Sequence, residues 1–227
     1  MAIKNFSKKE YFVFDAFGTL FQTSTISDDL KAIAGDKVDD LLQTWRRKQL
    51  EYSWLRNQMD AYVPFGQVTK EALDFSMRKH GLRHPQLFDL MLIYNQPSLI
   101  DGAFEALNFL KEKNKTVCIL SNGTRAMLEN GVKKTGIENI VDHLFTVDDI
   151  QIYKPRKEVY QMALSQLGAF ANDVLFFSSN QWDVSGASTF GLDSIWVNQY
   201  GEVSETLPFG SRVEVDGLPA ILDFFER

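Results

Sequence analysis

The sequence of 227 residues has little of what several protein classes require. Its one cysteine, Cys118, leaves no partner for an intramolecular disulfide and excludes a cysteine-based metal cluster. Because Cys118 lies within the apolar run 117–120, we expect it to be a buried core residue and not a nucleophile. The three histidines, His80, His84 and His143, are scattered along the chain, which does not favour a three-histidine zinc site.

An excess of positive charge and long apolar runs are also absent. With 24 Lys and Arg against 30 Asp and Glu, the net charge of −6 excludes a global basic field for nucleic acid. No stretch approaches the roughly 20 apolar residues of a membrane helix. The N-terminal apolar run ends at Asp15, too early for a signal peptide. We therefore expect a cytoplasmic protein without a nucleic-acid or membrane partner.

Short apolar runs are the main feature that the sequence does contain. They are separated by helix-length segments near 101–113, 124–136, 157–168 and 184–190. The runs do not alternate strictly between apolar and polar residues, which is typical of strands covered on both faces. The four runs are Tyr11–Phe14, Thr116–Leu120, Val174–Phe177 and Ser194–Val197. This pattern predicts an α/β fold with an open, mainly parallel, Rossmann-like sheet flanked by helices.

The interval 21–96 breaks this alternation of strands and helices. Its segments 39–56, 69–80 and 85–94 lack β-branched runs and indicate helices. We expect a helical cap subdomain over 21–96, inserted after the first strand of a core domain formed by 1–20 and 97–227.

Two arginines lie side by side in the helix expected at 39–56. Arg46 falls in one row with Leu42 and Leu50 at a spacing of four residues. Either Arg46 extends to solvent from the edge of a core, or it points into a cleft between the two domains. Arg47 points about 100° further round the helix, and we expect it to pair with Glu51 on the solvent side.

Polar residues follow three of the expected strands. Taken alone, such residues are usually turn formers or helix caps. The carboxyl ends of parallel strands meet at one edge of a sheet, where binding sites form. The three polar clusters are therefore expected to converge; they are Asp15 to Thr19, Ser121 to Gly123, and Ser178 to Asn180 followed by Asp183.

These clusters, together with Tyr153-Lys-Pro155, resemble the four motifs of the haloacid dehalogenase superfamily. Trp45-Arg46 and the segment 49–56 resemble the cap helix of its type II L-2-haloacid dehalogenases. The resemblance covers nearly the whole chain. It implies hydrolysis of short L-2-haloalkanoates to D-2-hydroxyalkanoates and halide through a covalent aspartyl ester. It also implies that the protein forms a homodimer, that its small-molecule partner is a 2-haloacid substrate, and that it needs no cofactor or metal.

The resemblance implies a role for each matching residue. Asp15 is the expected nucleophile, followed by a tight turn at Gly18. Arg46 and Asn122 would stabilise the leaving halide, and Lys154 would offset the crowded carboxylates. The expected catalytic residues are Asp15, Thr19, Arg46, Lys154, Ser178, Asn180 and Asp183. The expected substrate-binding residues are Ala16, Phe17, Arg46, Leu50, Phe65, Ser121, Asn122 and Trp182, although the four apolar side chains Phe17, Leu50, Phe65 and Trp182 would equally suit an ordinary core.

Two departures from the family pattern keep alternatives open. Phe17 stands where the superfamily's phosphatases carry a second Asp and where its dehalogenases commonly carry Tyr. Arg47 stands where the dehalogenase resemblance leads us to expect Gln. One alternative is a related hydrolase that opens a strained-ring amino acid. A Mg²⁺-dependent phosphatase and an inactive binding or scaffold protein are the others.

Overall fold

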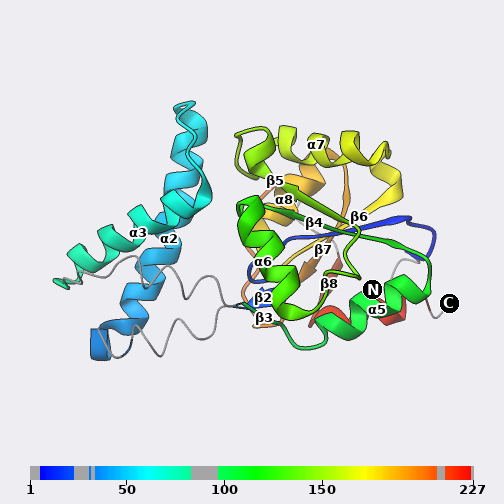
Figure 1. The fold of residues 1–227 in the computed structure, drawn as a ribbon, viewed down its shortest axis with the longest axis horizontal. Helices are drawn as coiled ribbons and strands as arrows, with labels where there is room; N and C mark the ends of the chain where they lie inside the picture. The colour runs from blue at the N-terminus through cyan, green and yellow to red at the C-terminus, as the bar shows by residue number, and fades with distance from the viewer. Residues whose placement is uncertain (1–5, 23–30, 32–33, 83–96, 209–212, 226–227) are drawn as a thin grey trace.

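A six-stranded sheet with all strands parallel forms the centre of the computed structural model (Figure 1). The model describes residues 6–22, 31, 34–82, 97–208 and 213–225. The strand order is β5-β4-β1-β6-β7-β8. The strands are β1 (Tyr11–Phe14), β4 (Thr116–Ser121), β5 (His143–Thr146), β6 (Val174–Ser178), β7 (Asp193–Val197) and β8 (Val213–Val215). The expected parallel α/β class is confirmed.

Helices cover both faces of this sheet, which explains why the strands are apolar without alternation. Phe12 and Phe14 point into one buried cluster, and Val13 and Cys118 point into the other. The first face is covered by α5 (Ala103–Glu112), α6 (Arg125–Thr135) and the 3₁₀ helix η4 (Leu218–Phe225). The second is covered by α7 (Lys157–Leu167) and α8 (Gln181–Phe190). As expected, Cys118 is fully buried, and burial raises the pKa of its thiol to about 12.

The four strands expected from apolar runs are present, and two edge strands, β5 and β8, were not predicted. Helix α8 begins at Gln181, ahead of the expected start at 184, so Trp182 and Asp183 lie in its first turn. Short 3₁₀ helices, η2 (Val147–Asp149) and η3 (Ala171–Asp173), fill connections.

A pair of long helices lies beside the sheet, as Figure 1 shows. These are α2 (Val38–Gln58), which follows η1 (Gly35–Lys37), and α3 (Phe65–Lys79). The short strands β2 (Phe21–Gln22) and β3 (Ser98–Leu99) pair antiparallel where the chain leaves and re-enters the core. The helix expected at 85–94 falls outside the described residues. The division into a core of 1–20 and 97–227 and a cap of 21–96 stays a prediction.

Apolar side chains and a few satisfied polar groups hold α2 against α3. Leu41 and Trp45 from α2 pack with Leu73 and Met77 from α3. The indole nitrogen of Trp45 donates to the carbonyl oxygen of Thr69 at 2.9 Å, so the buried polar group has its partner. Within the described residues, no helix is both long and apolar enough to cross a membrane.

Candidate active site

Asp15 lies immediately after β1, one of the two central strands, and is largely buried. Its backbone N–H donates to the carbonyl of Phe177 at 2.8 Å, which continues the pairing with β6. Its two carboxylate oxygens have different partners. Oδ1 accepts from Lys154 Nζ at 3.1 Å, while Oδ2 accepts from Thr19 Oγ1 at 3.0 Å and from Asn180 Nδ2 at 3.2 Å. The carboxylate is thus fixed by donors and charge.

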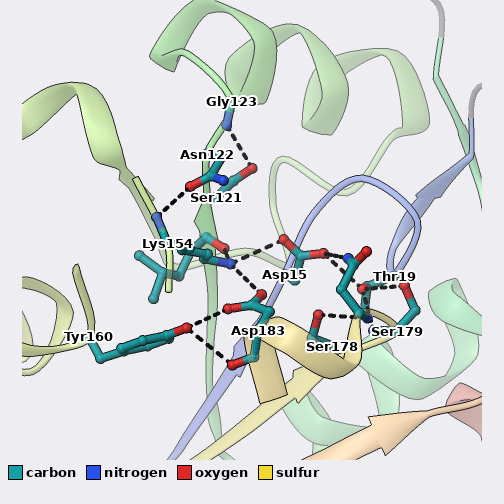
Figure 2. Close-up of polar contacts among 12 residues, drawn as sticks. Asp15, Thr19, Ser121, Asn122, Gly123, Lys154, Tyr160, Ser178, Ser179 and Asp183 are labelled. Carbon is teal, nitrogen blue, oxygen red and sulfur yellow. Dashed lines mark hydrogen bonds and ion pairs between the residues drawn. The ribbon is translucent and has the colours of Figure 1, made fainter. Parts of the chain in front are cut away.

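Lys154 is fully buried, and its ammonium group has a complete set of acceptors. Besides Asp15, Nζ donates to the carbonyl of Leu120 at 2.6 Å and to Asp183 Oδ2 at 2.8 Å (Figure 2). Burial alone would lower the pKa of Lys154, but the carboxylates of Asp15 and Asp183 outweigh it and raise the pKa above its usual value. The ammonium therefore stays charged between two carboxylates that could not otherwise lie so close.

Asp183 is the second carboxylate of this cluster and is also fully buried. Its Oδ1 accepts from the hydroxyl of Tyr160 at 2.7 Å, and its Oδ2 accepts from Lys154. Burial raises the pKa of Tyr160 well above its usual value, and the charge of Asp183 raises it further, so the phenol stays a neutral donor. Tyr160, from α7, completes the cluster and was not predicted, because a lone tyrosine in a helical segment carries no motif.

A tight turn holds Thr19 against Asp15. Gly18 has a φ of +91°, a conformation that favours glycine, as the sequence predicted. Three backbone N–H groups, those of residues 19, 20 and 21, donate to the carbonyl of Ala16. Ala16, an expected substrate-binding residue, is itself fully buried. Thr19 Oγ1 also accepts from the N–H of Ser179 at 2.9 Å, which links the turn to the end of β6.

Of the two alternatives left open for Arg46, the structure shows the one in which it points into a cleft. Arg46 Nη2, from α2, donates to Asn180 Oδ1 at 3.1 Å. The same Asn180 side chain donates to Asp15, so it bridges the helical pair to the carboxylate. The buried hydroxyl of Ser178 accepts from the N–H of Asn180 at 3.1 Å and fixes its backbone. Arg47 is exposed, and its expected partner Glu51 instead pairs with Lys48 at 2.7 Å.

The last residue of β4 and the residues after it close the other side of the cluster. Ser121 Oγ accepts from the N–H of Gly123 at 3.0 Å, and Ser121 is almost fully buried. Asn122 Oδ1 accepts from the backbone N–H of Lys154 at 3.0 Å. This contact orients the amide of Asn122 and leaves its Nδ2 as the end available to donate. All three expected clusters thus converge at one edge of the sheet (Figure 2).

A cavity of about 580 Å³ opens beside Asn180 and Arg46. Phe17, Leu50 and Trp182 line it, as expected of an apolar wall. Its lining also includes Gly18, Ser179, Gln181, Val197, Asn198, Tyr200, Glu202, Val203 and Glu205. Phe65 is not brought to this wall; it is buried, with its ring centroid 6.1 Å from that of Tyr153. Phe65 therefore has a packing position, because α3 begins with it and turns it inward.

Within the described residues, no group of three or more His, Cys, Asp or Glu side chains is placed to hold a metal. His80 Nε2 lies 3.2 Å from Thr44 Oγ1, and His143 stacks on Phe145. His84 falls outside the described residues. The carboxylates of Asp15 and Asp183 are already bridged by the Lys154 ammonium, which fills the place that a cation would take.

The fold and this cluster define an α/β enzyme with its site at the carboxyl edge of a parallel sheet. The chain belongs to the haloacid dehalogenase-like hydrolases, whose family model matches residues 10–191.

Known relatives resemble the chain over most of its length. The (S)-2-haloacid dehalogenase 4A of Burkholderia cepacia is 39% identical over 195 residues, 85% of this chain and 84% of the relative. The (S)-2-haloacid dehalogenase of Pseudomonas sp. strain YL is 36% identical over 218 residues, 94% and 93% of the two chains. The solved L-2-haloacid dehalogenase of Xanthobacter autotrophicus with chloropropionic acid covalently bound has a TM-score of 0.88 and 30% identity, covering 94% and 96%.

Proposed function

We propose that this protein hydrolyses short L-2-haloalkanoates to D-2-hydroxyalkanoates and halide through an ester on Asp15. The main support is the buried Asp15 carboxylate, which Lys154 and Asn180 hold in place. It lies next to a cavity that Arg46 enters from the helical pair. The names of the relatives support the substrate class.

In the first step, an oxygen of Asp15 attacks C2 of the substrate, and the carbon–halogen bond breaks with its electron pair leaving on the halide. Attack is in line, so C2 inverts. Arg46 and the Nδ2 of Asn122 are donors for the charge that develops on the halide. Ser121 and neighbouring N–H groups would hold the substrate carboxylate. Phe17, Leu50 and Trp182 exclude water and limit the alkyl group.

In the second step, water attacks the carbonyl carbon of the Asp15 ester and the bond to the substrate oxygen breaks. The hydroxy acid leaves, Asp15 regains a carboxylate, and one proton is released. Asn180 and Ser178 would order the ester, while Asp183 would hold Lys154 and help to position the water. No metal enters either step, since Lys154 supplies the positive charge.

Oxygen labelling tests the proposal. With enzyme in excess over substrate in H₂¹⁸O, the product hydroxy acid should be unlabelled, and ¹⁸O should appear in the peptide that contains Asp15. Direct attack by water would label the product and leave the peptide unlabelled. Asp15→Asn should abolish halide release, because a neutral amide is a poor nucleophile. Halide release should also survive EDTA; loss on chelation that Mg²⁺ restores would contradict the metal-free mechanism.

The cellular setting and assembly belong to the same proposal. A cytoplasmic homodimer accords with the resemblance and with one buried cysteine. Leu55 on α2 and Met59 directly after it are exposed apolar residues beside a groove shared with α3, and they suit contact with a second copy. Light scattering on the purified protein should give twice the chain mass.

A further inference from the structure

The end of α2 makes a second contact with the core, separate from that of Arg46. Asn57 Nδ2 donates to the carbonyl of Tyr153 at 2.7 Å, and the N–H of Tyr153 donates to Asn57 Oδ1 at 2.9 Å. Beyond α2, the hydroxyl of Tyr153 donates to the carbonyl of Val63, and that of Tyr62 donates to Asp148. Figure 1 shows the loop between α2 and α3 on the side of the helical pair that faces the core.

One peptide group lies at the centre of this contact. The carbonyl of Tyr153 and the N–H of Lys154 belong to the same planar unit and point in opposite directions. Asn57 holds the carbonyl end, and Asn122 holds the N–H end at 3.0 Å. The peptide is therefore fixed at both ends by asparagine side chains, one from the helical pair and one from the active site.

Two site groups depend on where this peptide lies. The side chain of Lys154 starts from it and must place Nζ within 3.1 Å of Asp15 and 2.8 Å of Asp183. The Oδ1 of Asn122 accepts a hydrogen bond from the same peptide, and this contact sets the direction of Nδ2. A rotation of the peptide would displace the ammonium and the amide donor together.

We propose that Asn57 is a positioning residue for the active site: it locks the 153–154 peptide, so that Lys154 and Asn122 are in place only while α2 is docked. The catalytic part rests on the proposed function. Asn57 touches neither substrate nor Asp15 and acts through the backbone. The alternative is a purely structural contact, in which Asn57 holds Tyr153 and the rest of the loop keeps its geometry without it.

The amide of Lys154 distinguishes these cases, because its acceptor, Asn122, is untouched by a substitution at 57. In Asn57→Ala, we expect hydrogen exchange of the Lys154 amide, read by NMR, to quicken by about tenfold or more. We also expect kcat for 2-chloropropionate to fall about tenfold with KM changed by less than about twofold, since displaced groups mainly lose transition-state contacts. The neighbouring exposed residue provides the control: Gln58→Ala should change neither quantity.

Wild-type exchange of the Lys154 amide in Asn57→Ala would overturn the proposal, and so would an unchanged kcat. Protection of the β4 amides checks that the variant is folded. If it is not, Asn57→Asp takes its place, because it keeps the acceptor for Tyr153 N–H and replaces the donor to the carbonyl with a carboxylate oxygen that cannot donate. If the wild-type protein released no halide, the proposed function would fail, whereas the exchange measurement would still decide the role of Asn57.

Discussion

At the scale of single residues, the site is governed by the need to satisfy buried charge. Lys154, Asp15 and Asp183 form a chain of ion pairs in which Lys154 and Asp183 have no exposed side-chain surface. Removing one member of such a set leaves an uncompensated buried charge, which costs about 3–5 kcal/mol. Tyr160 satisfies the last carboxylate oxygen of Asp183, so a neutral phenol is part of an ionic cluster.

The hydroxyl of Tyr160 is therefore expected to matter for stability as well as activity. Tyr160→Phe should lower the free energy of unfolding by about 1.5–3 kcal/mol, the range for a hydrogen bond to a charged group. Halide release should fall as well, because Asp183 would hold Lys154 less firmly. Urea unfolding and a halide assay measure the two effects; for the unfolding measurement, the exposed Tyr200→Phe is the matched control. Equal stability of the two variants would contradict this role.

Sequence reasoning reached most of this site but not all of it. Asp15, Lys154 and Asp183 were found because each follows an expected strand or lies in a recognisable motif. Tyr160 and Asn57 were missed because their partners are distant in the chain: Asp183 for Tyr160, and the backbone of Tyr153 for Asn57. A hydrogen bond from a side chain to the backbone can be made to any residue type, so the sequence contains no pattern that indicates it.

At the scale of elements, the phase of α2 determines which arginine reaches the site. Arg46 lies on the half-buried face and donates to Asn180, whereas Arg47 is exposed. The i, i+4 row of Leu42, Arg46 and Leu50 predicted that the two arginines point in different directions, since a helix fixes the direction of each side chain. It left open whether Arg46 extends to solvent or into a cleft.

Arg46→Lys should therefore cost much more activity than Arg47→Lys. Lysine keeps the charge but loses the planar fork that can contact Asn180 and a substrate together. We expect a loss of roughly 2–4 kcal/mol in transition-state stabilisation at position 46, the scale of one preorganised donor. Values of kcat/KM for both variants measure the difference. Small and equal losses would contradict the place of Arg46 in the site.

The packing of α8 against α7 requires a glycine. A Cβ on Gly186 would lie 2.5 Å from the Cβ of Pro155 and 2.7 Å from the hydroxyl of Tyr160. Neither neighbour can move easily, because Pro155 follows Lys154 and Tyr160 is held by Asp183. The absence of a side chain at Gly186 therefore lets Pro155 and Tyr160 pack closely against α8.

Gly186→Ala should thus destabilise the protein even though alanine favours a helix by about 1 kcal/mol. We expect a net loss of about 1–3 kcal/mol from overpacking, together with reduced activity. Gly66→Ala in α3 is the matched control, since nothing lies within 4 Å of its added Cβ. Thermal unfolding of both variants provides the comparison, and a stabilised Gly186→Ala would contradict the packing argument.

The strands that the sequence predicted are the buried ones, and the two strands that it missed lie at the edges of the sheet. The runs at Tyr11–Phe14 and Val174–Phe177 became β1 and β6, which are paired on both edges. Strand β5 begins with the exposed His143, and the three-residue strand β8 includes the exposed Glu214. Both lie at the edges of the sheet, where polar residues are tolerated and no unbroken apolar run is needed.

At the scale of the whole molecule, the buried charges join distant parts of the chain. Asp15 follows β1, Lys154 lies in the loop before α7, and Asp183 is in the first turn of α8. The Lys154 ammonium therefore links segments of the core that are far apart in sequence, and its protonation is coupled to global unfolding.

The sign of that coupling follows from the raised pKa of Lys154. Its contribution to stability is complete below the unfolded pKa of about 10.4 and is lost as the pH rises towards the higher pKa of the folded state. Lys154→Met should be less stable than wild type by about 3–5 kcal/mol near neutral pH. The difference between the two free energies of unfolding should narrow only above about pH 10.4, because unfolded wild type then loses the proton that the folded state still holds, which favours unfolding. Urea unfolding of both proteins from about pH 7 to about pH 11 measures it. A gap that stays constant across this window would show that a charged Lys154 is not what holds the two carboxylates together.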